Sequence, residues 1–169
     1  MTRRPLLAAC AFAVAFGFAA CGGDDEAGFS ERTLTFTEQE TGSFGFADNP
    51  PTTELGEQGP RKLSSGDEIT FSSELLDGSQ EPMGALEISC SVTRPGGFAD
   101  SHLHCTGTAT LADGSLTLAR GGRVFAGTDA SGAVLGGTGS YAAATGEFTE
   151  SEGSGGGTTY TLHIHLPER

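Results

Sequence analysis

The 169-residue sequence has no tryptophan, only two tyrosines, and only nine basic side chains against 22 acidic ones. The formal charge of −13 repels phosphate backbones, so nucleic acid is not expected as a partner. The sequence shows no heptad pattern, no internal repeat and no sustained helical period. It also lacks a Ser-His-Asp order, a His-Glu-X-X-His motif and a phosphate-binding loop. These absences exclude coiled coils and several common enzyme classes, and no cofactor is expected.

The amino terminus has the pattern of a secretory signal. Arg3 and Arg4 supply positive charge, and the following residues up to Ala20 are uncharged and almost wholly apolar. This run is shorter than the roughly 20 apolar residues that a membrane-spanning helix needs. Positions 18–21, Phe-Ala-Ala-Cys, resemble the lipobox of bacterial lipoproteins. In that family the cysteine is lipidated and becomes the first residue of the mature chain.

We therefore predict a lipoprotein signal peptide over residues 1–20, followed by a lipidated Cys21 and a flexible acidic tether over residues 21–30. The lipid would be the contact with a bacterial membrane, and it would hold the protein on the extracytoplasmic side. The alternative is an ordinary secreted protein in which Cys21 is unmodified. Residues 31–169 remain for one domain, which is long enough to bury a sizeable core.

Most of this domain alternates polar and apolar residues, as half-buried strands do. Nine runs have strand character, and about eight strands are expected from them: 33–38, 69–75, 86–93, 102–111, 116–120, 124–126, 133–135, 147–149 and 160–166. The segment 40–67 is rich in glycine, proline and serine, and no regular element is expected there. A meander with one apolar face tends to close on itself, because closure removes exposed edges. The predicted fold is all-β, a small eight-stranded antiparallel barrel that side chains fill or that holds one small ligand.

Two of the expected strands carry a cysteine on the apolar face. If the turn between them lies around residues 95–100, antiparallel pairing puts Cys90 opposite Cys105 and Val92 opposite Leu103. Directly opposed cysteines in an exported protein should be oxidised to a disulfide. The alternative is two free, buried cysteines.

A glycine-rich run near the carboxyl end has the order GGTG, any residue, an aromatic, small residues and glycine, and its motif residues are Gly136, Gly137, Gly139, Tyr141 and Gly146. This run resembles the signature of the allene oxide cyclase and dirigent barrels. Several other residues follow the order and spacing of the cyclases, namely Gly66-Asp67, Phe71, Asp77-Gly78, Met83-Gly84 and Cys90. The resemblance covers about residues 31–166 and implies an eight-stranded barrel with an apolar lumen, often assembled as a homotrimer. The glycines are interpreted as geometry, since they permit positive φ and close strand approach.

The catalytic residues of the cyclases do not carry over. Their first-strand glutamate and the asparagine two residues later align with Thr35 and Thr37. Their lumen cysteine aligns with Cys90, which is expected to be in a disulfide. Ala143 and Thr145 replace a glycine and an arginine that are common in dirigent and bacterial relatives. The acids and the arginine of the dirigent proteins cannot be placed in this sequence, and an allene oxide cyclase reaction is not expected.

Two polar residues share a strand face with apolar neighbours and are candidate catalytic groups. Glu38 shares the face of Phe36 and could serve as a general acid at the rim of the lumen. A strand-end glutamate that reaches water is the simpler alternative. Tyr160 shares the face of Leu162 and could donate its hydroxyl to a bound ligand, although a tyrosine in such a place is more often simple core.

The four histidines form two His-X-His pairs, His102 with His104 and His163 with His165. This spacing puts both rings of a pair on one side of a strand, as in some metal sites. All four lie opposite the apolar faces, however, and their two strands are not expected to be neighbours in a barrel. Solvated or interface histidines are therefore expected, and no metal site.

Three functions remain open. The preferred one is non-enzymatic: an extracytoplasmic, lipid-anchored barrel that binds a small apolar ligand in its lumen or a partner at its surface. The alternative is an isomerase or cyclase, allene oxide cyclase-like, that acts on an apolar and lipid-derived substrate through Glu38 and Tyr160. The third is a filled, structural barrel without chemistry. The first is preferred because the sequence offers no convincing acid–base pair in an otherwise apolar interior.

Overall fold

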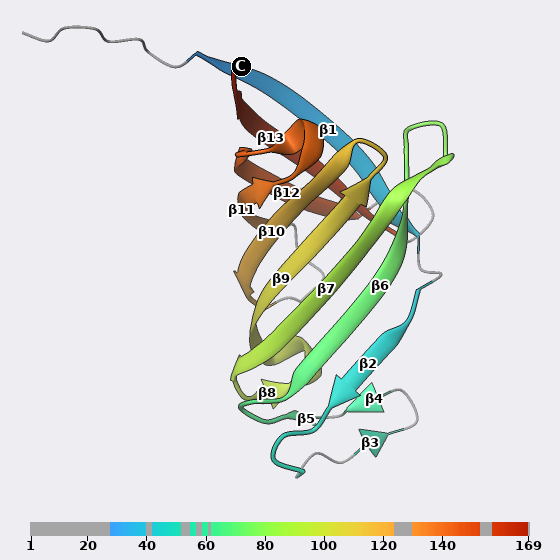
Figure 1. The fold of residues 1–169 in the computed structure, drawn as a ribbon. Coiled ribbons are helices and arrows are strands. Elements are labelled where there is room, and N and C mark those ends of the chain that lie inside the picture. The colour runs from blue at the N-terminus through green and yellow to red at the C-terminus, as the bar shows by residue number, and fades with distance from the viewer. Residues whose placement is uncertain are drawn as a thin grey trace, which may run out of the picture.

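The computed structural model describes residues 28–39, 42–51, 55–56, 59–60, 62–123, 130–152 and 157–168. Within these ranges the chain forms strands and two 3₁₀ turns (Figure 1): β1 (Phe29–Gln39), β2 (Phe44–Ala47), β3 (Leu55–Gly56), β4 (Gly59–Pro60), β5 (Lys62–Leu63), β6 (Glu68–Leu76), β7 (Pro82–Arg94), β8 (Gly96–Gly97), η1 (Phe98–Asp100), β9 (His102–Leu111), β10 (Gly114–Gly122), β11 (Ala130–Gly137), η2 (Gly139–Tyr141), β12 (Thr145–Glu152) and β13 (Thr158–Pro167). The predicted signal peptide, Cys21 and the expected strand at 124–126 lie outside the described residues. No helix among the described residues is long and apolar enough to cross a membrane.

Eight long antiparallel strands close into a barrel, which confirms the predicted fold class. Their order is β1-β13-β12-β11-β10-β9-β7-β6, and the ring closes where β6 pairs with the end of β1. The start of β1 pairs with the end of β13, through Phe29 opposite Pro167. β1 therefore includes the last two residues of the segment predicted as a tether. Figure 1 shows the carboxyl end of the chain beside the start of β1.

The segment 40–67 contains short strands, contrary to the expectation from its composition. β2 pairs with β6 from Phe44 opposite Phe71 to Ala47 opposite Glu68, so it continues along β6 beyond the end of β1. β3 pairs with β4, and β5 pairs with β8. Strand formation in this segment depends on hydrogen bonds to neighbouring strands rather than on local preference. These short strands therefore carry little alternation of their own. Sequence patterning therefore missed them.

A buried carboxylate fastens this segment to the barrel. Asp67 is fully buried, directly before β6. Its oxygens accept hydrogen bonds from the Asn49 backbone N–H at 3.0 Å, the Ser64 backbone N–H at 2.7 Å and the Ser64 hydroxyl at 2.8 Å. Hydrogen bonds to an ionised acceptor are stronger than neutral ones, and more so away from water. Asp67 thus ties the chain after β2 to the turn that starts β6.

The inward faces of the strands form two adjoining apolar clusters. On β9 the buried residues are Leu103, Cys105, Gly107, Ala109 and Leu111, which is the predicted face. The larger cluster includes Phe36, Phe148, Leu162 and Ile164. The smaller one contains Leu63, Ile69, Cys90, Val92, Leu103 and Cys105. Burial on alternate positions of each strand accounts for both clusters.

The predicted cysteine pairing is present. β7 and β9 pair in a register that puts Cys90 opposite Cys105 and Val92 opposite Leu103. The two cysteines form a disulfide with their Cα atoms 4.0 Å apart, and both are buried. The alternation of the two strands and the expected position of the turn together predicted this register, because a slip by one residue would put the apolar face of one strand beside the polar face of the other.

The glycine-rich run forms the corner between β11 and β12. Gly139 has a φ of +60° and Gly146 a φ of +152°, and a Cβ on either would lie within 2.3 Å of a neighbouring carbonyl oxygen. These contacts account for the two glycines by geometry. Ala143 also has a positive φ of 60°, and it stands where dirigent and bacterial barrels commonly have glycine. Tyr141 is buried in this corner, beneath the guanidinium of Arg32 at 5.3 Å from its ring centroid.

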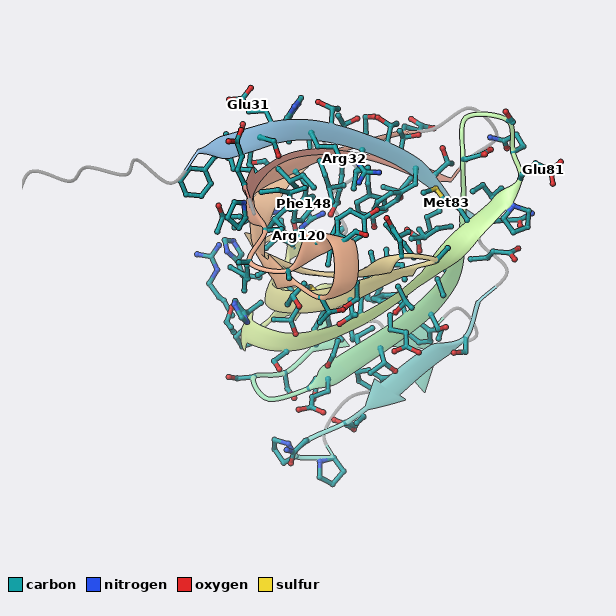
Figure 2. All side chains as sticks on the ribbon, turned by 45° about the horizontal axis from the view of Figure 1, so that its top comes forward. Glu31, Arg32, Glu81, Met83, Arg120 and Phe148 are labelled. Carbon is teal, nitrogen blue, oxygen red and sulfur yellow. A yellow bond between two sulfur atoms is a disulfide. The ribbon has the colours of Figure 1, made fainter. Side chains whose placement is uncertain are left out.

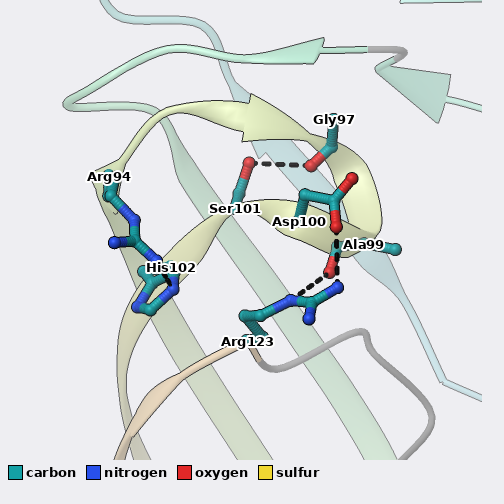
Figure 3. A network of polar contacts seen from close by, with 7 residues as sticks. All are labelled: Arg94, Gly97, Ala99, Asp100, Ser101, His102 and Arg123. Atoms are coloured by element: carbon teal, nitrogen blue, oxygen red, sulfur yellow. Dashed lines mark hydrogen bonds and ion pairs between the residues drawn. The ribbon is translucent and has the colours of Figure 1, made fainter.

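A polar network holds the turn between β7 and β9 (Figure 3). The Ser101 hydroxyl and backbone N–H both donate to the Gly97 carbonyl, at 3.0 and 2.9 Å. Arg123, just after β10, donates to the Ala99 carbonyl and pairs with Asp100 at 2.6 Å. The network therefore links the start of β9 to the end of β10 at one end of the barrel.

The Asp67 contacts generate a prediction about stability. Asp67→Ala leaves two backbone N–H groups and one hydroxyl without their acceptor, and it should lower the free energy of unfolding by about 3 kcal/mol. Urea unfolding followed by circular dichroism measures this loss. The matched control is Glu68→Ala, which removes an exposed carboxylate one residue later and should stay within about 0.5 kcal/mol of the wild type. Equal midpoints for the two variants would contradict the role given to Asp67.

The disulfide generates a second prediction. Its cysteines are 15 residues apart, and closing a loop of that length stabilises a protein by about 3 kcal/mol. The double variant Cys90→Ala/Cys105→Ala should lose roughly that amount in the same unfolding experiment. A reductant should shift the unfolding midpoint of the wild type and leave that of the double variant unchanged. A wild type that is indifferent to reductant would argue against a stabilising disulfide.

Candidate active site in the barrel lumen

The barrel contains a cavity of about 410 Å³ between the two apolar clusters. Its apolar wall includes Leu86, Ile88, Leu118, Phe148 and the Cys90–Cys105 disulfide. Its polar wall includes Glu38, Ser73, Arg120, Glu150 and Tyr160. Phe44 also lines the cavity and is 51% exposed, so the cavity reaches the surface beside β2. This size and this mixture of surfaces suit a small organic ligand.

The two candidate lumen residues from the sequence lie together in this cavity. The Tyr160 hydroxyl donates to Glu38 Oε2 at 3.1 Å, and the Ser73 hydroxyl donates to Glu38 Oε1 at 2.5 Å. The three groups come from β13, β1 and β6, which are consecutive strands of the barrel. Glu38 is opposite Leu75 on β6, two residues from Ser73. Closure of the barrel therefore brings a carboxylate and two hydroxyls to one place.

Burial fixes the protonation state of the phenol. Tyr160 is only 4% exposed. Desolvation raises the pKa of Tyr160 far above its ordinary value, and the charge of Glu38 and the hydrogen bond to it raise the pKa further. Tyr160 is therefore a neutral hydrogen-bond donor at physiological pH. Its oxygen keeps lone pairs that can accept a hydrogen bond from a ligand.

A second polar pair spans one strand of the barrel wall. Arg120 of β10 donates through Nη1 to Glu150 of β12, and the two side chains are 10% and 15% exposed. β11 lies between these strands, and its inward positions there are Ala130 and Gly132. A Cβ at Gly132 would lie 2.4 Å from the Phe148 ring. Small residues on β11 therefore leave room for Arg120 to reach across to Glu150.

The Arg120 guanidinium is only partly hydrogen-bonded. Its Nε is buried and has no hydrogen-bond partner within the described part of the chain. Burial also lowers the pKa of the Arg120 guanidinium from its ordinary value. Figure 2 looks toward the end of the barrel and shows Arg120 and Phe148 within the ring of strands.

Sequence reasoning did not assign Ser73, Arg120 or Glu150 to a site. The signal was available, because Arg120 continues the inward face of Leu118 and Glu150 continues that of Phe148. The expected strand over 147–149 ends one residue before Glu150. A polar residue that continues an apolar face at a strand end is the pattern that identifies this site.

The positions aligned with the catalytic pair of the cyclases contribute nothing to the cavity. Thr35 is exposed, and Thr37 contacts the Thr159 hydroxyl at 3.3 Å on the neighbouring strand. Glu38, one residue further along β1, supplies the lumen carboxylate instead. Cys90 does line the cavity, as the resemblance implies, but it does so as half of a disulfide.

The four histidines lie on the outer face of the barrel, where His104, His163 and His165 are exposed and His102 is half-buried against Arg94 (Figure 3). The two His-X-His pairs lie on β9 and β13, which are not adjacent in the barrel. Within the part of the chain that the structure describes, no three His, Cys, Asp or Glu residues are grouped so that they could hold a metal ion.

No protein-family model and no curated protein matches this sequence. Several solved structures share its fold. A pyocyanin demethylase superposes with a TM-score of 0.60 at 23% identity, over 79% of this chain and 99% of that one. The pterocarpan synthase dirigent protein GePTS1 gives a TM-score of 0.58 at 13% identity, over 83% of this chain and 92% of that one.

The exo-specific intermolecular Diels-Alderase AbnU gives a TM-score of 0.56 at 16% identity, over 81% of this chain and 99% of its own. The sequence identities are low, so these similarities establish the fold. The chain has the barrel of the dirigent and cyclase proteins, as the glycine-rich run suggested.

The buried phenol generates a prediction about pH. Because the pKa of Tyr160 is raised in the folded state above its ordinary value of 10.0, its stabilising contribution is complete below pH 10 and is lost as the pH rises above it. A spectrophotometric titration at 295 nm should show the Tyr160 phenolate only together with alkaline unfolding. The Tyr160→Phe variant reports Tyr141 alone and serves as the reference. A Tyr160 that ionises near pH 10 in the folded protein would contradict its burial.

Proposed function

We propose that the lumen binds a small, mostly apolar molecule and promotes its isomerisation or cyclisation. The observation that carries this proposal is the hydrogen-bonded Glu38–Tyr160 pair inside the cavity. The preference for a non-enzymatic barrel depended on the lack of a convincing acid–base pair in the interior. A carboxylate and a neutral phenol in contact at the wall of a cavity constitute such a pair.

The chemistry available to this pair is proton transfer and the stabilisation of developing charge. Glu38 can take a proton from a substrate carbon or hydroxyl and return it to another position of the same molecule, so that atoms and electrons balance without a cofactor. Tyr160 can turn its hydroxyl from Glu38 to a substrate oxygen that becomes negative. Ser73 keeps its hydrogen bond to the carboxylate and holds it in place during such a turn.

The fold agrees with this proposal without establishing it. The structures that share the barrel include proteins described as a cyclase and as Diels-Alderases, along with the dirigent proteins. One fold hosts many functions, so the support from these structures is by analogy. The Glu38–Tyr160 pair in this chain is the independent argument.

Binding without turnover is the second candidate function. The supporting observation is the Arg120–Glu150 ion pair, which is costly to bury and which lies at the cavity wall. A carrier would use this pair to orient a ligand and would not need Glu38 as a base. The same barrel could serve either role, and turnover is the measurement that separates them.

We also propose that the protein is exported and attached to the outer face of a membrane through lipid on Cys21. The support is the signal-like pattern of residues 1–20 and the lipobox-like junction. Only residues 22–28 separate Cys21 from the start of β1. A barrel on so short a tether would stay close to the membrane surface, where apolar molecules concentrate.

The first experiment is native mass spectrometry of the full-length protein after incubation with a total lipid and metabolite extract. We expect a retained small-molecule adduct that disappears on denaturation, and we expect its mass to identify the compound to be tested for turnover. Chromatography then measures whether the protein converts that compound to an isomer of the same mass, and such conversion would support catalysis. A retained compound that is never converted would favour the carrier.

Isosteric variants test the catalytic pair. Glu38→Gln and Tyr160→Phe should each lower the rate of isomer formation by about 10² or more, since removal of a general acid or base has effects of this size. Ligand retention in native mass spectrometry should stay within a few fold, because the shape of the cavity is kept. The control is Glu87→Gln, an exposed change on the outer face of β7. Turnover that is insensitive to both lumen variants would remove Glu38 and Tyr160 from the mechanism.

A further inference from the structure

The polar wall of the cavity contains an arginine whose guanidinium is only partly hydrogen-bonded within the described part of the chain. Arg120 Nη1 is engaged by Glu150, while Arg120 Nε is buried with no hydrogen-bond partner in the described part of the chain. A buried donor without an acceptor is unfavourable, and it becomes favourable when a ligand supplies an oxygen. Because Arg120 lines the cavity, an oxygen of a ligand in the lumen can approach its guanidinium.

The carboxylates of the same wall already accept hydrogen bonds. Both oxygens of Glu38 receive hydroxyl donors, from Tyr160 and Ser73, as expected of a carboxylate that acts only as an acceptor. Glu150 accepts from Arg120 through one oxygen. Among these three charged groups, only the Arg120 guanidinium has a buried atom without a hydrogen-bond partner in the described part of the chain, so it calls for an acceptor.

The charges of the wall restrict what that acceptor can be. Glu38 and Glu150 supply two carboxylates, and Arg120 supplies one guanidinium. A ligand carboxylate would add a further negative charge to a wall that already has an excess of acid. Like charges repel strongly where water is scarce. A neutral carbonyl oxygen accepts the same hydrogen bond without this repulsion.

We infer that the lumen selects neutral, apolar molecules that carry a carbonyl oxygen, with the Arg120 guanidinium as the hydrogen-bond donor, and that it discriminates against carboxylic acids of the same size. This inference rests on the proposed function, since it concerns the ligand of the same cavity. The hydrocarbon part of the ligand would pack against Leu86, Ile88, Leu118 and Phe148. Arg120 is thus a specificity-determining residue, and Glu150 positions it.

Three probes of equal chain length separate the contributions of shape, carbonyl and charge. These are undecane, 2-undecanone and undecanoic acid at neutral pH, each tested for binding to the full-length protein by displacement of a fluorescent apolar dye. We expect the ketone to bind roughly 10-fold or more tightly than the hydrocarbon, in line with a hydrogen bond from a charged donor. We expect the acid to bind at least roughly 10-fold more weakly than the ketone.

A double variant tests the assignment to Arg120. Arg120→Met/Glu150→Leu removes both partners, because removing the arginine alone would leave Glu150 buried and unpaired. In this variant the ketone should lose its advantage over undecane, while undecane should still bind. The matched control is Arg94→Met, an exposed arginine on the outer face, which should leave the order of the three probes unchanged.

The outcomes separate this inference from the proposed function. If undecane and 2-undecanone bind the wild type equally, or if the acid binds as well as the ketone, the inference is overturned and a binding lumen remains. If none of the three probes binds, the proposed function fails and the inference fails with it. The wild-type series is decisive even if the double variant does not fold.

Discussion

The closure of the barrel between β1 and β6 is the interaction on which the rest of this structure depends. Three residue pairs at the end of β1 complete the ring of eight strands, and β2 continues the contact along β6. Closure turns a sheet with one apolar face into an enclosed lumen. It also brings Glu38 next to Ser73, and the pairing of β1 with β13 places Tyr160 beside the same carboxylate, so the two pairings of β1 together assemble the site.

The lumen keeps ionised and polar groups that stability alone would not favour. Burying the Arg120–Glu150 pair and the Glu38 carboxylate costs desolvation, and apolar residues in their place would serve a filled barrel better. The fold compensates with two apolar clusters, the Cys90–Cys105 disulfide and the Asp67 hydrogen bonds. Such an arrangement is typical of functional sites, where polar groups persist at the expense of stability.

Sequence patterning succeeded where the pattern is local and periodic. The alternation of two strands and the turn expected between them placed Cys90 opposite Cys105, and the glycine-rich run was correctly interpreted as a barrel corner. It failed for β2 and β5, which are strands only because β6 and β8 pair with them. Glu38 and Tyr160 were proposed separately, from the faces that they share with apolar residues, and the sequence contained no reason to place them in contact.

The amino-acid sequence by itself determined the all-β class, the direction of each side chain along its strand, and the disulfide, because these follow from a period of two residues and from one turn between neighbouring strands. Only the tertiary structure decided that Glu38 meets Tyr160 and Ser73, and that Arg120 reaches Glu150 across β11. Glu38 and Tyr160 are 122 residues apart in the chain. Their contact depends on the pairing of β1 with β13 at opposite ends of the chain, and no local pattern specifies this pairing.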